Sequence, residues 1–141
     1  MSGSWVEARI AATTAMEDIK DMSLGDIDDG IIQMEKKRVL SPLNKKSGIS
    51  PMEMRDRLQK IMDEYAGGIS MNYELDEERL LEARKLLKCL KERIKDLSVM
   101  NNYNLVEALE CIDRIDVARV LVEHLLYRKE TRWSCYQSRL D

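Results

Sequence analysis

The chain has little of the two residues that interrupt helices, with two prolines and six glycines among 141 residues. Most of these lie between Pro42 and Gly68, so the sequence on either side runs long without a break. No apolar run approaches the length of a membrane-spanning helix, and we expect no direct insertion into a membrane. These absences favour long helices in a soluble protein.

Cysteine is also scarce, and the charge has no strong sign. The three cysteines, Cys89, Cys111 and Cys135, are odd in number and widely spaced, which suits reduced thiols better than a disulfide framework. The first residues lack the features of a signal peptide, so we expect a cytoplasmic protein. A net charge of −3 provides no broad basic surface, and nucleic acid is not an expected partner.

Sequence motifs for catalysis and for cofactors are missing as well. There is no GxGxxG, Walker loop, CxxC or HExxH, and His124 is the single histidine. We therefore expect no catalytic residue and no metal site within this chain. Cys89 and Cys111 lie on or beside apolar stripes, where buried and unreactive thiols are the ordinary outcome.

Three stretches have apolar residues at the helical spacings of three and four. They cover residues 50–65, 76–97 and 104–129, and the acidic run ELDEE at 74–78 is expected to solvate a helix start. In SPME, Ser50 can cap a helix and Glu53 can complete a capping box. The residues expected in or beside the core are Met54, Leu58, Ile61, Met62, Tyr65, Leu80, Ala83, Leu87, Leu90, Ile94, Leu97, Met100, Leu105, Ala108, Leu109, Ile112, Ile115, Val122 and Leu126.

These stripes predict an all-α fold, an antiparallel three-helix bundle of the spectrin-repeat-like kind over residues 50–130. Residues 1–49 form an extra N-terminal helical segment, with helices expected at 4–21 and 26–39. The first of these helices is rich in Ala, Ser and Thr, so it presents a small-residue face that suits half of an interface.

The tail, residues 131–141, carries alternating charges. Glu130, Arg132, Tyr136, Arg139 and Asp141 are the candidate docking and structural residues, because guanidinium–carboxylate pairs hold geometry as well as charge. A frayed, charged helix end is the alternative interpretation.

The stretch from Arg128 to Arg132, followed by Arg139 and Asp141, resembles the end of the flavoprotein subunits of succinate dehydrogenase, fumarate reductase, L-aspartate oxidase and adenylylsulfate reductase. Those proteins close their C-terminal helical domain with a Glu-Ser/Thr-Arg tripeptide. RLQKIMDEYAGG and SGSWVEARIAA are similar to further segments of the same family, so the resemblance covers nearly the whole chain. Trp133 and the Ser-Gly-Ser start look more like the adenylylsulfate reductase branch.

The resemblance implies an FAD-dependent oxidoreductase whose flavin domain precedes this region in a longer parent protein. Residues 1–49 and the tail would then pack on that flavin domain, and an iron–sulfur subunit would be the electron-transfer partner. Backbone groups of Ser2, Gly3 and Ser4 would contact the flavin in the intact parent. The chain alone would hold no FAD and have no activity.

An independent helical-bundle module for protein interaction is the competing interpretation. The tail distinguishes the two. If it docks on a flavin domain outside this chain, residues beyond about Arg132 should be mobile here, or ordered only by a neighbouring molecule. If it packs firmly on its own bundle, the self-contained module is favoured.

Overall fold

The computed structural model describes residues 2–23, 25–131 and 137–141. Contacts divide the chain into two units between Glu35 and Lys36, earlier than the predicted boundary at residue 49. The prediction of an all-α fold is confirmed. Within the described ranges, the strands are two segments of two residues each, β1 (Glu74–Leu75) and β2 (Ser138–Arg139).

The first unit contains two helical pieces and the beginning of a third. They are α1 (Ser2–Asp18), the 3-10 turn η1 (Ile19–Asp21) and the first half of α2 (Asp29–Leu40). Every side chain from Gly3 to Ser23 is exposed, including Trp5 at 78%. The described residues of this unit therefore form no core of their own.

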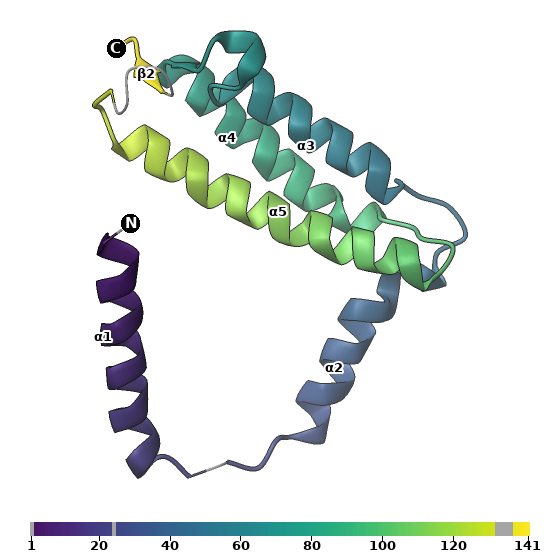
Figure 1. Cartoon of the computed structure of the whole chain (residues 1–141). Coiled ribbons are helices and arrows are strands. Elements are labelled where there is room, and N and C mark those ends of the chain that lie inside the picture. The colour runs from purple at the N-terminus through teal and green to yellow at the C-terminus, as the bar shows by residue number, and fades with distance from the viewer. Residues whose placement is uncertain (1, 24, 132–136) are drawn as a thin grey trace. The chain divides into compact units, whose positions relative to one another are not determined.

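The second unit is the predicted bundle of three helices. Its α4 runs antiparallel to the other two, as Figure 1 shows. The elements of this unit after α2 are η2 (Ser41–Asn44), α3 (Pro51–Tyr65), η3 (Ile69–Met71), β1, α4 (Glu77–Glu92), η4 (Arg93–Asp96), α5 (Asn102–Tyr127) and β2. None of the helices in the described ranges has both the length and the apolar character needed to cross a membrane.

Side-chain caps begin all three bundle helices. Ser50 Oγ accepts from Glu53 N at 3.1 Å, as predicted. The Glu53 carboxylate does not complete the capping box in the expected way, because its Oε1 lies 2.6 Å from Nη2 of Arg57. Asp76 and Asn101 cap α4 and α5 in the same manner as Ser50. After α3, Gly67 adopts a φ of +73°, the left-handed conformation that ends the helix.

The bundle core is apolar, because the buried residues that form it in the described part of the chain are all hydrophobic. Its largest fully buried side chains include Met54, Leu80, Leu87 and Ile115. The partly buried residues packed against it include several predicted core positions, namely Ile61, Met62, Tyr65, Ile94, Leu109, Ile112 and Leu126. The buried core residues are Ile49, Met54, Leu58, Ala66, Leu75, Leu80, Ala83, Leu87, Leu90, Leu97, Val99, Leu105, Ala108, Cys111, Ile115, Ala118, Val122 and Leu125.

Two predictions about the core are wrong. Met100 is 94% exposed, because it lies in the connection before the cap of α5 and outside the helical stripe. Cys89 is also exposed, since it lies two positions after the buried Leu87 and helical geometry turns it to the outer face of α4. Cys111 is buried as expected, and burial raises the pKa of its thiol.

Candidate functional site

The end of the chain forms a short parallel sheet with the loop that precedes α4. Ser138 is paired with Glu74, and Arg139 with Leu75. The hydrogen bonds run from Ser138 N to Tyr73 O at 3.1 Å and from Leu140 N to Leu75 O at 2.9 Å. The last residues are therefore attached to the bundle through their backbone.

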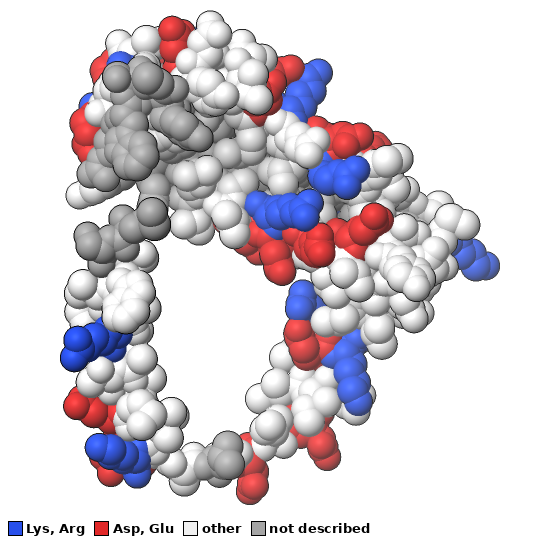
Figure 2. Space-filling model, viewed as in Figure 1, with Lys and Arg blue, Asp and Glu red and all other residues white. Residues whose placement is uncertain are grey.

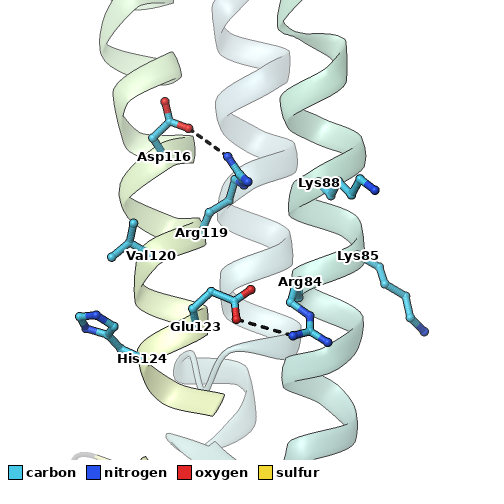
Figure 3. Close-up of a pocket in the computed structure, with 8 residues that line it drawn as sticks. All are labelled: Arg84, Lys85, Lys88, Asp116, Arg119, Val120, Glu123 and His124. Atoms are coloured by element: carbon cyan, nitrogen blue, oxygen red, sulfur yellow. Dashed lines mark hydrogen bonds and ion pairs between the residues drawn. The ribbon is translucent and has the colours of Figure 1, made fainter. Parts of the chain in front are cut away.

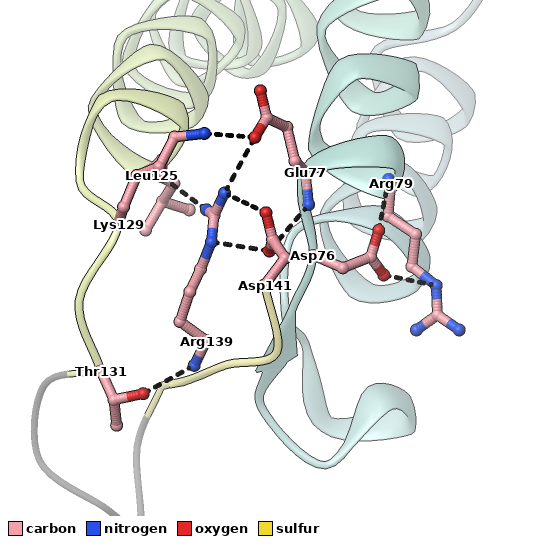
Figure 4. Close-up of polar contacts among 8 residues, drawn as sticks. All are labelled: Asp76, Glu77, Arg79, Leu125, Lys129, Thr131, Arg139 and Asp141. Carbon is pink, nitrogen blue, oxygen red and sulfur yellow. Dashed lines mark hydrogen bonds and ion pairs between the residues drawn. The ribbon is translucent and has the colours of Figure 1, made fainter.

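Arg139 places its guanidinium between the helices that flank this sheet. Its side chain is 2% exposed, and its Nη1 donates to Leu125 O at 2.9 Å (Figure 4). That carbonyl belongs to the last turn of α5, where carbonyl groups lack a partner within the helix. Arg139 therefore closes the C-terminal end of α5.

Asp141 neutralises the same guanidinium and also reaches α4. Its Oδ2 accepts from Arg139 Nη2 at 3.1 Å, and its Oδ1 lies 2.8 Å from Nε as an ion pair without hydrogen-bond angles. Oδ1 also accepts from the backbone N of Glu77 at 3.1 Å, the first residue of α4. Partial desolvation, the largest single effect, raises the pKa of Asp141, but the hydrogen bond and charge of Arg139, with weaker effects of Glu77 N and Lys129, leave it below its ordinary value.

Further polar contacts surround this pair. Lys129 Nζ pairs with the Glu77 carboxylate, and Thr131 Oγ1 accepts from Arg139 N at 3.0 Å. We call Glu77, Leu125, Lys129, Thr131, Arg139 and Asp141 the Arg139 cluster. It joins three segments of the chain: the end of α5, the beginning of α4 and the tail.

The chemistry of the Arg139 cluster is structural. It contains carboxylates and cations that neutralise one another, and it offers no nucleophile beside a base. Among the residues that the structure describes, no group of three His, Cys, Asp or Glu side chains could hold a metal ion. The contacts of the cluster hold the tail on the bundle.

The residues singled out in the sequence fall into three groups. Arg139 and Asp141 meet in the cluster, and Glu130 is exposed nearby. Arg132 and Tyr136 lie outside the described residues. Residues 2–4 begin α1.

Sequence reasoning missed Glu77 and the carbonyl of Leu125 as partners of the tail. Glu77 lies in the acidic run that was expected to solvate a helix start, and it does occupy the first turn of α4. Its position beside the tail has no local signal, because it lies 64 positions before Asp141 in the chain.

Comparison of the chain with models of known protein families identifies the family to which it belongs. Residues 55–140 match the family model described as "Fumarate reductase flavoprotein C-term", a span that begins within α3 and extends through β2. The chain belongs to this family. The resemblance inferred from the sequence is confirmed.

Individual relatives agree with this assignment. The alpha subunit of adenylylsulfate reductase from Megalodesulfovibrio gigas is 29% identical over 93 residues, which cover 66% of this chain and 14% of that protein. The structure of adenylylsulfate reductase from Archaeoglobus fulgidus is 37% identical, with a TM-score of 0.84, over 98% of this chain and 24% of that chain. The Mycobacterium smegmatis Sdh1 complex in the apo form is similar in fold, at 21% identity and a TM-score of 0.64, over 83% of this chain and 20% of that one. This chain thus spans about a quarter or less of each relative.

Proposed function

We propose that this chain is the C-terminal part of a flavoprotein subunit in an FAD-dependent oxidoreductase of the adenylylsulfate reductase type. The observation that carries the proposal is the match to the Archaeoglobus fulgidus enzyme at 37% identity over 98% of this chain. The match to Sdh1 has 21% identity, so the succinate dehydrogenase branch has weaker support.

The proposed role is to pack on the flavin domain and to stabilise it. Support comes from α1, whose large apolar side chains, including Trp5, Val6 and Ile10, are exposed. Figure 2 shows uncharged residues, drawn white, along much of this helix, and grouped exposed apolar side chains commonly mark an interface. The bundle already buries a core of its own, so α1 is the element with most to gain from a flavin domain.

FAD itself would contact little of this chain. A Cβ added at Gly3 would meet nothing within 4 Å, so the start of α1 forms no enclosed cradle here. In the proposed parent, the start of α1 would line one open side of the flavin site, and Ser2, Gly3 and Ser4 would contact the flavin through backbone groups. FAD supplies two-electron transfer when bound, and this chain would help to hold the flavin domain around it.

Partner and location complete the proposal. The relative named as subunit alpha is by its name one part of a larger enzyme, and we propose an iron–sulfur subunit as the electron-transfer partner of this protein. The free thiols of Cys89 and Cys111 support a reducing compartment, and we propose the cytoplasm. By itself the chain is expected to be inactive.

Packing of the tail on its own bundle was expected to favour an independent interaction module. Residues 137–141 do pack on the bundle, yet the family match extends through residue 140. The Arg139 guanidinium is used within this chain, because a backbone carbonyl and a carboxylate lie within its reach. Tail packing is therefore compatible with the flavoprotein and does not separate the two functions.

A complementation experiment tests the proposal. The Archaeoglobus fulgidus flavoprotein is shortened to remove the region that matches this chain, and flavin retention on gel filtration is measured with and without added chain. We expect the added chain to co-elute and to increase the flavin bound. Trp5→Ser with Ile10→Ser should abolish co-elution, whereas Met52→Ser, at an exposed position of α3, should not. Equal behaviour of both variants, or no complex at all, would contradict the proposed packing.

A further inference from the structure

A hollow of about 670 Å³ lies on the surface of the bundle between α4 and α5 (Figure 3). Its lining contains four cations and two carboxylates, those of Asp116 and Glu123. Arg84, Lys85 and Lys88 come from α4, and Arg119 comes from α5. We call this hollow the α4–α5 groove.

Two ion pairs cross between the helices on either side of the groove's centre. Lys91 Nζ lies 2.5 Å from Asp116 Oδ2, and Arg84 Nη1 lies 3.6 Å from Glu123 Oε2. On each helix the two pairs are seven residues apart, which is about two helical turns. Because α4 and α5 are antiparallel, these two ion pairs are regularly spaced along the contact between the helices.

The position between these two ion pairs has no carboxylate. Lys88 follows Arg84 by one turn on α4 and is level with Arg119 of α5, a second cation (Figure 3). Figure 3 also shows the Lys88 ammonium turned away from Arg119, the arrangement expected of like charges. Val120, the next residue on α5, is exposed and cannot neutralise either group.

Neighbouring acids do not fill this deficit. Arg119 Nη1 lies 3.4 Å from Asp116, but the same carboxylate already binds Lys91. Lys85 pairs with Glu82 on its own helix, at 3.0 Å. Within the described part of the chain, Lys88 makes no ion pair or hydrogen bond. Among the residues that line the groove, four Lys and Arg cations therefore meet two carboxylates.

We propose that the α4–α5 groove binds an acidic segment of a partner polypeptide, with one carboxylate of the partner between Lys88 and Arg119. Charge complementarity selects an acidic partner, because the groove has a local cationic excess although the chain carries a net charge of −3. The size of the groove favours a peptide segment over a single ion, and Val120 adds an apolar contact at its centre. This goes beyond the proposed packing on the flavin domain and does not depend on it.

Fluorescence anisotropy with a labelled peptide tests the groove in the whole chain. The probe is a ten-residue peptide of alternating Glu and Ala, and a Gln–Ala peptide is the neutral comparison. Lys88→Glu should weaken binding of the acidic probe by roughly tenfold or more, because a like charge would face the incoming carboxylate. Lys88→Gln, which only removes the charge, should weaken it by roughly threefold.

Lys46→Glu is the matched control, because Lys46 is exposed in the loop before α3 and the substitution changes the net charge equally. It should alter binding by less than about twofold. Three results would overturn the proposal: equal weakening by the Lys46 and Lys88 variants, equal binding of the neutral peptide, or displacement of the probe by inorganic phosphate at matched concentration. The last result would identify a site for a free anion.

Discussion

Arg139 and Asp141 lie two positions apart, yet one binds the last turn of α5 and the other binds the first residue of α4. The guanidinium and the carboxylate also neutralise each other, at 3.1 Å between Nη2 and Oδ2. A single strand end thus connects two helices that contact each other along the bundle.

Replacement of Arg139 by Ala should lower the free energy of unfolding by about 2–3 kcal/mol, as expected when a buried charged donor and its bonds are lost. Arg139→Lys should restore only part of this, because an ammonium cannot reproduce the planar fork. Urea unfolding followed by circular dichroism measures both. Arg55→Ala, at a half-exposed arginine of α3, is the control. An equal loss in the control would show that the cluster does not stabilise the bundle.

Stability should fall in acid through Asp141. Its pKa in the folded chain lies below the ordinary 3.8, so its contribution is complete above that value and is lost as the pH falls through the lower folded pKa. Urea midpoints measured from pH 6 down to about pH 2 should therefore decline less steeply in Asp141→Asn than in the unchanged chain. Asp113→Asn, on the exposed surface of α5, is the comparison. Parallel curves for all three proteins would contradict the assignment.

The apolar stripe of α4 can be tested at its C-terminal half. Leu90→Ala should cost about 2–5 kcal/mol, because it leaves a cavity in the core. Met100→Ala should stay within about 0.5 kcal/mol, since that side chain is exposed. Thermal unfolding compares them directly, and similar costs would mean that the stripe is placed wrongly.

The two described cysteines should differ in reactivity. In a Cys135→Ser background, iodoacetamide at neutral pH should modify Cys89 and leave Cys111 unmodified, because burial removes Cys111 from solvent and raises its thiol pKa. Mass spectrometry should find one modification in the folded chain and two in urea. Rapid modification of both thiols in the folded chain would contradict the burial of Cys111.

The helices of the bundle were predictable because polar residues mark their outer faces. In α4 the alternation of apolar and charged residues leaves one possible stripe, and Leu80, Ala83, Leu87 and Leu90 are all buried as predicted. In α5 the contrast is weaker, since apolar residues such as Val117 also lie on the exposed side. The predicted stripe therefore included partly buried neighbours such as Ile112 and Leu126, and it omitted the following buried residues: Ala118 and Leu125.

The candidate site was predictable only in part. Alternating charge near the end of the chain identified Arg139 and Asp141 as a possible pair. Their contacts with Leu125 and Glu77 depend on how the helices fold together, and no spacing within the tail encodes that placement. The expectation that Arg139 would hold the tail on another domain overlooked the unpaired carbonyl groups that every helix end provides.

The contact between Glu77 and Asp141 spans 64 positions and encloses both α4 and α5. Bringing two such distant residues together costs conformational entropy of the chain between them. We therefore expect this contact to form only after α4 and α5 have formed and packed. The tail should consequently join the bundle after the main barrier to folding. Removal of the last five residues should then accelerate unfolding and leave the folding rate nearly unchanged, so this segment would set how long the folded bundle persists.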